Sequence, residues 1–340
     1  MKRLYVVIAL LLMVCFMTDL GGAQNRKAGI NAAAFLKIGV GARQVGLGSA
    51  TTSLTNDVTN MYWNPAGIAL SGEEKLQAAF TYNSWFADLT QQAAAVSYKL
   101  EDIGTIGLGF MTFGVSGIPA DRDVYPNNPS LAALQIDQAT SATYDYRDML
   151  VQLTYARNIT DRLALGVSLK YIGEKIDDQT ASAYAFDFGS VYDIGLLGWK
   201  IGARLNNLGS DIKFYDFAAP IPLTFSIGTS MTPFQDDMNS VTVSVDGVKP
   251  QDGLQYYYAG GEYTFMKMIS LRGGYKFNYS GVDDGGSSLA SAIKTSVEGY
   301  TLGAGFMTAF QDYAIHLDYA YTKMDIVKSV HRFTLSVGMK

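Results

Sequence analysis

The last ten residues of the chain alternate large apolar side chains with small or polar ones up to the C-terminus. They read His-Arg-Phe-Thr-Leu-Ser-Val-Gly-Met-Lys over residues 331–340, and the same alternation recurs across most of the chain. A strand in the wall of a membrane barrel shows one face to lipid and the other to the lumen, so its pattern has a period of two. The sequence therefore predicts a transmembrane antiparallel β-barrel in the bacterial outer membrane.

Residues 1–23 have the composition of a secretory signal peptide. A basic start is followed by an apolar core over residues 4–16 and by small residues that end at Ala23. We expect cleavage near Ala23 and a mature chain that begins at about Gln24. Cys15 is the only cysteine and lies in the apolar core. The mature chain would then have no thiol, which excludes disulfides, cysteine nucleophiles and thiolate metal sites.

The composition favours a barrel over a soluble enzyme of the same length. The chain has 35 Gly, 22 Tyr and 17 Phe, while charged residues make up only 17%, below the usual quarter or so. The formal net charge is -5 and no basic run is present. Nucleic acid is excluded as a partner because phosphate binding needs clustered Lys and Arg. No motif for a cofactor or a metal is present, and we expect none to be bound.

Fourteen segments of the chain carry strand alternation, and an even count is typical of bacterial single-chain barrels. The segments are 75–85, 89–100, 103–115, 146–157, 162–174, 183–193, 198–207, 221–232, 240–248, 254–265, 268–279, 299–309, 313–323 and 329–340. Every second connection is short, and we expect these to be periplasmic turns. The other set includes three long connections, Ser116–Asp145, Gly209–Pro220 and Ser280–Glu298. We expect these to face outside.

Side-chain parity assigns the charged residues of the strands to the lumen. Over residues 163–171 the odd positions are large and apolar, so the even positions, which include Lys170, face inward. A Lys or Arg turned to lipid at mid-membrane costs about 2–4 kcal/mol, so each strand should take the register that turns these residues inward. The predicted lumen charges are Lys170, Lys200, Arg204, Asp246, Arg272, Lys276, Asp318 and Arg332.

These inward charges have two interpretations. They form a polar path or binding site, or they pair across the lumen and hold the barrel rigid. The second is favoured because a barrel of this size can fill its interior with side chains and a plug. The aromatic clusters at residues 256–258 and 275–279 are interpreted as interfacial girdles rather than as ligand-stacking sites.

Residues 24–74 do not alternate like a wall strand. Their high content of Ala and Gly permits close packing, and we expect a short helix from about Ala28 and a glycine-rich stretch over residues 39–48. A second short helix near Asp57 and a turn at Asn64-Pro65 follow. The chain thus divides into a signal peptide (1–23), an N-terminal hatch or plug (24–74) and an outer-membrane β-barrel (75–340).

Two blocks in the hatch carry a specific motif. The first runs from Phe35 to Arg43 and is followed by Gly46-Leu47-Gly48, and the second runs from Trp63 to Ala69. Together they resemble the PorV/PorQ family, within the wider group of FadL-like outer-membrane proteins. This resemblance implies a fourteen-stranded barrel with an N-terminal hatch. The residues that carry it are Phe35, Leu36, Lys37, Gly39, Gly41, Arg43, Gly46, Gly48, Trp63, Asn64, Pro65, Ala66 and Gly67.

The resemblance implies a non-enzymatic part in the type IX protein secretion system. A protein of this kind would receive secreted cargo through its conserved C-terminal domains. It would shuttle or gate that cargo between a translocon barrel and the subunits of a cell-surface attachment complex. The expected partners are therefore these proteins and outer-membrane lipid.

The alternative is a FadL-like channel for small hydrophobic molecules, which would need an apolar pocket under the hatch. An outer-membrane hydrolase is rejected: His316 and His331 are the only histidines, and no G-x-S-x-G motif is present. We therefore expect no catalytic residues.

Overall fold

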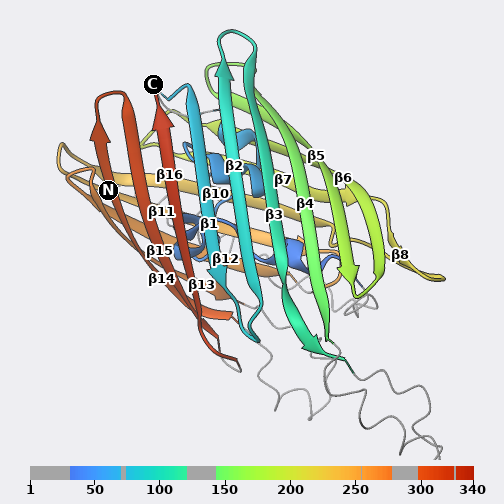
Figure 1. The fold of residues 1–340 in the computed structure, drawn as a ribbon. Helices are drawn as coiled ribbons and strands as arrows, with labels where there is room; N and C mark the ends of the chain where they lie inside the picture. The colour runs from blue at the N-terminus through green and yellow to red at the C-terminus, as the bar shows by residue number, and fades with distance from the viewer. Residues whose placement is uncertain (1–30, 70–73, 121–142, 254, 278–297, 325–326) are drawn as a thin grey trace, which may run out of the picture.

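The chain forms one closed antiparallel barrel. A computed structural model describes residues 31–69, 74–120, 143–253, 255–277, 298–324 and 327–340. Within these ranges, fourteen strands form the wall in the order β1-β16-β15-β14-β13-β12-β11-β10-β7-β6-β5-β4-β3-β2 (Figure 1). The wall closes where Leu76 pairs with Met339 and, at the other end of the same ladder, Ser84 pairs with His331. The all-β fold and the count of fourteen wall strands are confirmed.

Most strand boundaries lie within a few residues of those predicted. The wall strands are β1 (Leu76–Ser84), β2 (Thr90–Leu100), β3 (Gly104–Pro119), β4 (Thr143–Asn158), β5 (Leu163–Ile176), β6 (Gln179–Asp193), β7 (Lys200–Gly209), β10 (Thr224–Gln235), β11 (Asn239–Pro250), β12 (Tyr256–Phe265), β13 (Ile269–Phe277), β14 (Glu298–Phe310), β15 (Tyr313–Met324) and β16 (Val330–Met339). β3 and β4 extend into the segment 116–145, which was predicted as a loop, because antiparallel pairing continues to Pro119↔Thr143.

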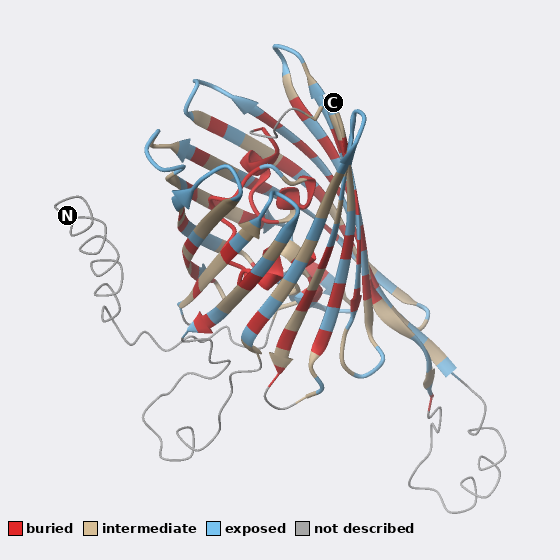
Figure 2. Cartoon of the chain, turned by 90° about the vertical axis from the view of Figure 1, so that its left-hand side faces the viewer, coloured by how far each residue is buried: buried red, intermediate tan, exposed pale blue. Residues whose placement is uncertain are grey.

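Burial alternates along the strands, as Figure 2 shows by the bands of red and pale blue. Outward side chains such as Leu108, Leu271 and Leu317 are more than half exposed, and together they form an apolar outer surface. This surface suits a bilayer, in which a barrel wall must be apolar outside and can be polar inside. Short connections gather at one end: the β2–β3 turn lies at the top of Figure 1, beside the C-terminus.

The long connection predicted at Gly209–Pro220 lies between β7 and β10, and it contains a small hairpin that the sequence pattern did not predict. β8 (Ile212–Phe214) pairs with β9 (Phe217–Ala219) as a separate two-stranded sheet. Ile212 is buried against the barrel core, whereas the hairpin's Tyr215 and Phe217 are 76% and 86% exposed. The apolar Ile and Phe residues provide the alternation that a short hairpin needs.

A hatch of irregular chain and single helical turns fills the lumen. Its elements are η1 (Ala34–Lys37), α2 (Ala42–Gly46), η2 (Val58–Tyr62) and η3 (Pro65–Ile68). Figure 2 shows these buried turns inside the barrel. No helix in the described part of the chain is long and apolar enough to cross a membrane.

Local sequence explains where the hatch turns begin. Asp57 accepts a hydrogen bond from the Thr59 backbone N–H and starts η2, and Asn64 accepts one from Ala66 and starts η3. Pro65 follows Asn64 at the first helical position, where its missing N–H costs nothing. These turns lie where a helix near Asp57 and a turn at Asn64-Pro65 were predicted.

Two predictions within the hatch need correction. The stretch 39–48 was predicted as glycine-rich without a helix, but α2 forms within it because Ala42, Arg43 and Gln44 are ordinary helix residues between the glycines. The helix predicted from about Ala28 falls partly outside the described residues. Within them the first helical turn begins at Ala34.

Glycines on the inner wall bring the hatch backbone into direct contact with the strands. Gly166 pairs with Gly189 across β5 and β6, Gly202 with Gly228 across β7 and β10, and Gly260 with Gly274 across β12 and β13. A Cβ at Gly166 would lie 2.4 Å from the hatch, and one at Gly274 would lie 2.1 Å from it. Any larger residue would displace the hatch, which explains part of the high glycine content.

Candidate functional site

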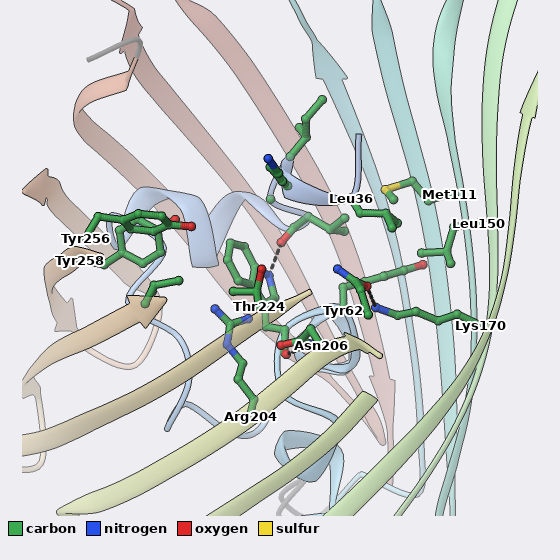
Figure 3. A pocket seen from close by; sticks show the side chains of 17 residues that line it. Leu36, Tyr62, Met111, Leu150, Lys170, Arg204, Asn206, Thr224, Tyr256 and Tyr258 are labelled. Atoms are coloured by element: carbon green, nitrogen blue, oxygen red, sulfur yellow. Dashed lines mark hydrogen bonds between the residues drawn. The ribbon is translucent and has the colours of Figure 1, made fainter. Parts of the chain in front are cut away.

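The hatch separates two cavities at opposite ends of the lumen. The inner cavity, about 470 Å³, lies at the end with short turns and is bordered by Arg43, Asp57 and Glu262. The outer cavity, about 70 Å³, lies between the hatch and the outer half of the wall. Its lining includes Trp63 and Arg204, and Figure 3 shows the side chains around it. A solute that crosses the barrel would have to pass from one cavity to the other.

The hatch motif holds its own chain together around the outer cavity. The Trp63 indole N–H donates to the Val40 carbonyl at 2.8 Å, and a Cβ at Gly39 would collide with the Trp63 ring at 2.7 Å. Asn64 Nδ2 donates to the Thr52 carbonyl at 2.6 Å and to the Ser190 carbonyl of β6 at 3.1 Å. Trp63 and Asn64 therefore position the hatch.

The other residues of the motif pack around these contacts. Phe35 is buried in the core, and Leu36 packs against that core and lines the outer cavity. Gly41 and Gly48 adopt the left-handed backbone region, at φ +89° and +66°. A Cβ at Gly46 would press on Gly303, and one at Gly67 would press on Asn60. Pro65 and Ala66 form the turn that contacts Gly166.

An ion-pair network joins the hatch to the wall beside the inner cavity. Arg43 donates to Glu262 on β12 from Nε at 3.1 Å and from Nη2 at 2.9 Å. Arg272 on β13 donates to Glu262 at 2.5 Å and to Asp318 on β15 at 2.5 Å. The network links one hatch residue and three strands, and its charges alternate in sign. Sequence reasoning missed Glu262 because the pattern assigned faces but not partners.

A second set of polar contacts lies on the outer side of the hatch. Lys37 forms an ion pair with Asp252, which follows β11. Lys170 on β5 lies 2.5 Å from Asp187 on β6 and donates to Asn207 at 2.9 Å. The register between β6 and β7 shifts here, because Asn206 and Asn207 both lie opposite Asp187. This bulge directs two amides toward the cavity.

The remaining predicted lumen charges have different partners. Lys200 donates to Thr55 of the hatch at 2.7 Å, and Asp246 accepts from Thr51 and Thr52. Lys276 pairs with Glu298. Arg332 is buried. In the amide orientation that satisfies its neighbours, the side-chain oxygen of Asn83 accepts a hydrogen bond from Arg332 Nη2 at 2.9 Å. The structure thus brings Arg272 and Asp318 together but leaves Arg204 and Arg332 without a carboxylate hydrogen bond among the described residues.

Two of the three tyrosines that begin β12 face the lumen, whereas they were predicted to belong to an interfacial girdle. Tyr256 and Tyr258 line the outer cavity with their ring centroids 5.2 Å apart (Figure 3), so the girdle interpretation was wrong for both. Three consecutive tyrosines show no alternation, and parity could be read only from the flanking residues. Tyr275 and Phe277 do face outward, and Tyr279 lies outside the described residues.

The described residues of the lumen include no group of side chains suited to a metal ion. No three side chains of His, Cys, Asp or Glu gather in a way that could hold a metal ion in the described part of the chain. His316 borders the inner cavity together with Asp318.

Comparison with known proteins identifies the fold. No protein-family model matches the chain, and no curated protein matches its sequence. The solved Pseudomonas putida toluene transporter TodX is similar, with a TM-score of 0.51 and 13% identity over 88% of this chain and 97% of that chain. A deltaS2 mutant of the TodX monoaromatic hydrocarbon channel has a TM-score of 0.55 and 11% identity, covering 88% of this chain and 97% of the other.

At this level of identity the similarity shows the fold alone. The chain has the FadL-like fold, a fourteen-stranded outer-membrane barrel with short helical turns near its N-terminus. The predicted location in the bacterial outer membrane is confirmed. The comparisons do not support the narrower assignment to the PorV/PorQ family.

Proposed function

We propose that the protein is a gated outer-membrane channel for small molecules. The observation that supports this function best is the pair of cavities on either side of the hatch. A small solute would enter the outer cavity, and a shift of the hatch would connect it with the inner one. The TodX structures, described as a toluene transporter and a monoaromatic hydrocarbon channel, have the same fold and favour this proposal over a secretion role.

The size of the outer cavity and the fit of the hatch limit the mechanism. The inner wall meets the hatch at glycines, so no open pore passes beside it at these contacts. Passage therefore needs a displacement of the hatch, and the contacts that resist it include the ion pair Arg43–Glu262 and the pair Lys37–Asp252. The cavity suits small solutes rather than folded proteins.

The experiment is to lock the hatch to the wall. The backbone N–H of Ala42 in α2 donates to Thr334 Oγ1 of β16 at 2.8 Å, so an Ala42→Cys, Thr334→Cys variant places two thiols close together. Oxidation should abolish barrel-dependent uptake of radiolabelled small solutes, with toluene, acetate and phosphate as the probes, by intact cells, and reduction should restore it. Uptake that depends on the barrel and is unchanged by oxidation would contradict the gate.

A matched control shares one of these cysteines. Thr81 and Thr334 are paired across β1 and β16, with their hydroxyl oxygens 2.9 Å apart. A Thr81→Cys, Thr334→Cys variant links two strands of the wall and leaves the hatch untethered. Its uptake should be insensitive to oxidation.

The secretion role implied by the two N-terminal blocks is the second candidate. It rests on the sequence resemblance of residues 35–48 and 63–69, and its partners would be a translocon barrel, surface-attachment subunits and secreted C-terminal domains. Affinity purification from gently solubilised outer membranes, followed by mass spectrometry, tests it. Recovery of these partners would favour secretion, and a barrel that is purified without them would favour the channel.

A further inference from the structure

We propose that the outer cavity binds a compact oxyanion, a carboxylate or phosphate group, through the guanidinium of Arg204. This inference rests on the proposed channel function for its biological meaning, since it names the class of solute. Binding itself can be measured without transport. The argument begins with the charges that line the cavity.

Three cationic side chains line the outer cavity, and the described lining contains no carboxylate. Lys37 pairs with Asp252, and Lys170 pairs with Asp187. The charges of these two lysines are therefore compensated by neighbouring groups. Arg204 is the cation of this described lining for which no ion pair to a carboxylate is found. The lining therefore includes one positive charge that is not held in an ion pair.

The position of Arg204 makes this charge costly. Arg204 is only 7% exposed, and its Nε has no hydrogen-bond partner among the described residues. The guanidinium carbon lies 5.4 Å from the centre of the Trp63 ring, and Figure 3 shows the group pointing into the cavity. A guanidinium whose Nε is buried without a hydrogen-bond partner loses part of its hydration and gains little in return. An anion in the cavity would restore both charge balance and hydrogen bonds.

Asp246 lies close enough to Arg204 for their charges to interact. One Asp246 oxygen already accepts three hydrogen bonds from Thr51 and Thr52 of the hatch, at 2.7–2.9 Å. No hydrogen bond joins Asp246 to Arg204 among the described groups, and Asp246 is not part of the cavity lining. Asp246 anchors the hatch, and the face of Arg204 that points into the cavity is left for a ligand.

The other polar groups of the cavity fit the same ligand class. Asn206 Oδ1 is buried without a partner in the described structure, although its Nδ2 donates to the Trp63 carbonyl and to Asp187. Asn206 and Arg204 lie two residues apart on β7 and share a face. A ligand with an oxyanion for Arg204 and a hydroxyl for Asn206 would satisfy both, and dihydrogen phosphate and hydroxy acids have these groups.

The volume of the cavity limits the ligand to a few heavy atoms. At about 70 Å³, it holds a few water molecules, because one water needs roughly 10–15 Å³ by this measure. Acetate and phosphate are of suitable size. Leu36, Met111 and Leu150 form one side of the cavity, where the methyl group of a small carboxylate could lie.

The test measures binding to the purified full-length barrel in detergent by titration calorimetry. The probes are sodium phosphate, sodium acetate and acetamide, the last being a neutral molecule with the shape of acetate. We expect phosphate or acetate to bind and acetamide to bind at least tenfold more weakly. Binding of phosphate alone or acetate alone identifies which oxyanion the site takes. Equal binding of acetate and acetamide, or no binding of either oxyanion, would overturn the inference.

Two variants locate the site. Arg204→Gln should weaken oxyanion binding by about 10- to 100-fold, as expected for the loss of hydrogen bonds to a charged group. Lys200→Gln removes a lumen charge from the same strand, outside the cavity, and should leave binding unchanged. Arg204→Lys keeps the charge without the forked donors and should bind with intermediate affinity. Equal losses in Arg204→Gln and Lys200→Gln would show that only the total lumen charge matters.

A fluorescence readout separates binding from folding. Trp63, Trp85 and Trp199 are the three tryptophans of the chain, so a Trp85→Phe, Trp199→Phe background leaves Trp63 beside Arg204 as the reporter. Oxyanions should change its emission, and the unliganded spectrum of each variant shows whether the hatch is in place. Oxyanion binding without any uptake would refute the channel and leave this inference standing. Uptake without oxyanion binding would refute the inference alone.

Discussion

Arg43 of the hatch and Glu262 of β12 form a two-point ion pair, with Nη2 2.9 Å from Oε1 and Nε 3.1 Å from Oε2. Glu262 also accepts from Arg272, which in turn donates to Asp318. A single hatch side chain thus completes a charge network that crosses three strands. Because the partners are mostly buried, the network contributes to where the hatch lies.

Replacing Arg43 with Gln should loosen the hatch. Glu262 would keep Arg272 but lose two charge-assisted hydrogen bonds, and we expect the free energy of unfolding to fall by about 1–3 kcal/mol. Urea unfolding of the refolded barrel measures this change, and limited proteolysis of the hatch reports its release. The exposed pair Lys75–Glu101 is the control. Lys75→Gln should change stability little, because water and salt screen an exposed ion pair.

Adjacent glycines on β13 allow a matched test of the fit between hatch and wall. A Cβ at Gly274 would lie 2.1 Å from the Gly48 nitrogen, whereas one at Gly273 would meet nothing within 4 Å. Gly274→Ala should destabilise the barrel by about 1–3 kcal/mol or displace the hatch. Gly273→Ala should be neutral or slightly stabilising, since Gly is costly in a strand.

Thermal unfolding of both variants measures this contrast, and proteolysis shows whether the hatch is still seated. Similar melting temperatures for Gly274→Ala, Gly273→Ala and the wild type would mean that the hatch is not held against β13.

The wall could be predicted from the sequence because its physics is local. A period of two marks each strand, and the same parity places Arg272 and Asp318 on one face. Parity could not show that Arg272 bonds Glu262 and Asp318, because such pairs depend on which strands are neighbours and on their register. Arg43 and Glu262 are 219 positions apart, and their contact depends on the path of the hatch through the lumen.

The least predictable parts were those without a regular period. Tyr256 and Tyr258 form part of an uninterrupted run of aromatics, and their lumen position appears only when the pairing of β12 with β11 and β13 is known. The outer cavity was not predicted, because its shape depends on the β7 bulge at Asn206 and Asn207 and on the hatch residues that line it.

The turn between β10 and β11 should make a pH-dependent contribution to stability. Backbone N–H groups of Asn239 and Met238 donate to Asp236 at 2.6 and 2.8 Å. These hydrogen bonds lower the pKa of Asp236 below its usual value. A carboxyl whose pKa is lower in the folded state stabilises that state above its unfolded pKa, and the contribution is lost as the pH falls through the folded pKa.

Comparison of the wild type with Asp236→Ala isolates this contribution. The wild type should melt at the higher temperature at neutral pH, and the difference should shrink as the pH is lowered into the acidic range. A difference that stays constant with pH would mean that the charge of Asp236 plays no part.

Two buried arginines of the lumen, Arg272 and Arg204, should differ sharply in how much the unfolding free energy changes when each is replaced by Met. Arg272→Met leaves Asp318 buried without its ion-pair partner, and removing one member of a buried pair typically costs about 3–5 kcal/mol. Arg204 makes no ion pair with a described carboxylate and leaves its own Nε unsatisfied, so Arg204→Met removes a desolvated charge at little loss. We expect the unfolding free energy of Arg204→Met to change by less than about 1 kcal/mol or to rise.

Urea titrations in the same detergent compare the two variants. A loss in Arg204→Met as large as that in Arg272→Met would mean that Arg204 is already satisfied without a ligand, through Asp246 or bound water. The electrostatic case for an oxyanion in the outer cavity would then fail, whereas a small effect would mean that Arg204 is held in place for a ligand rather than for the fold.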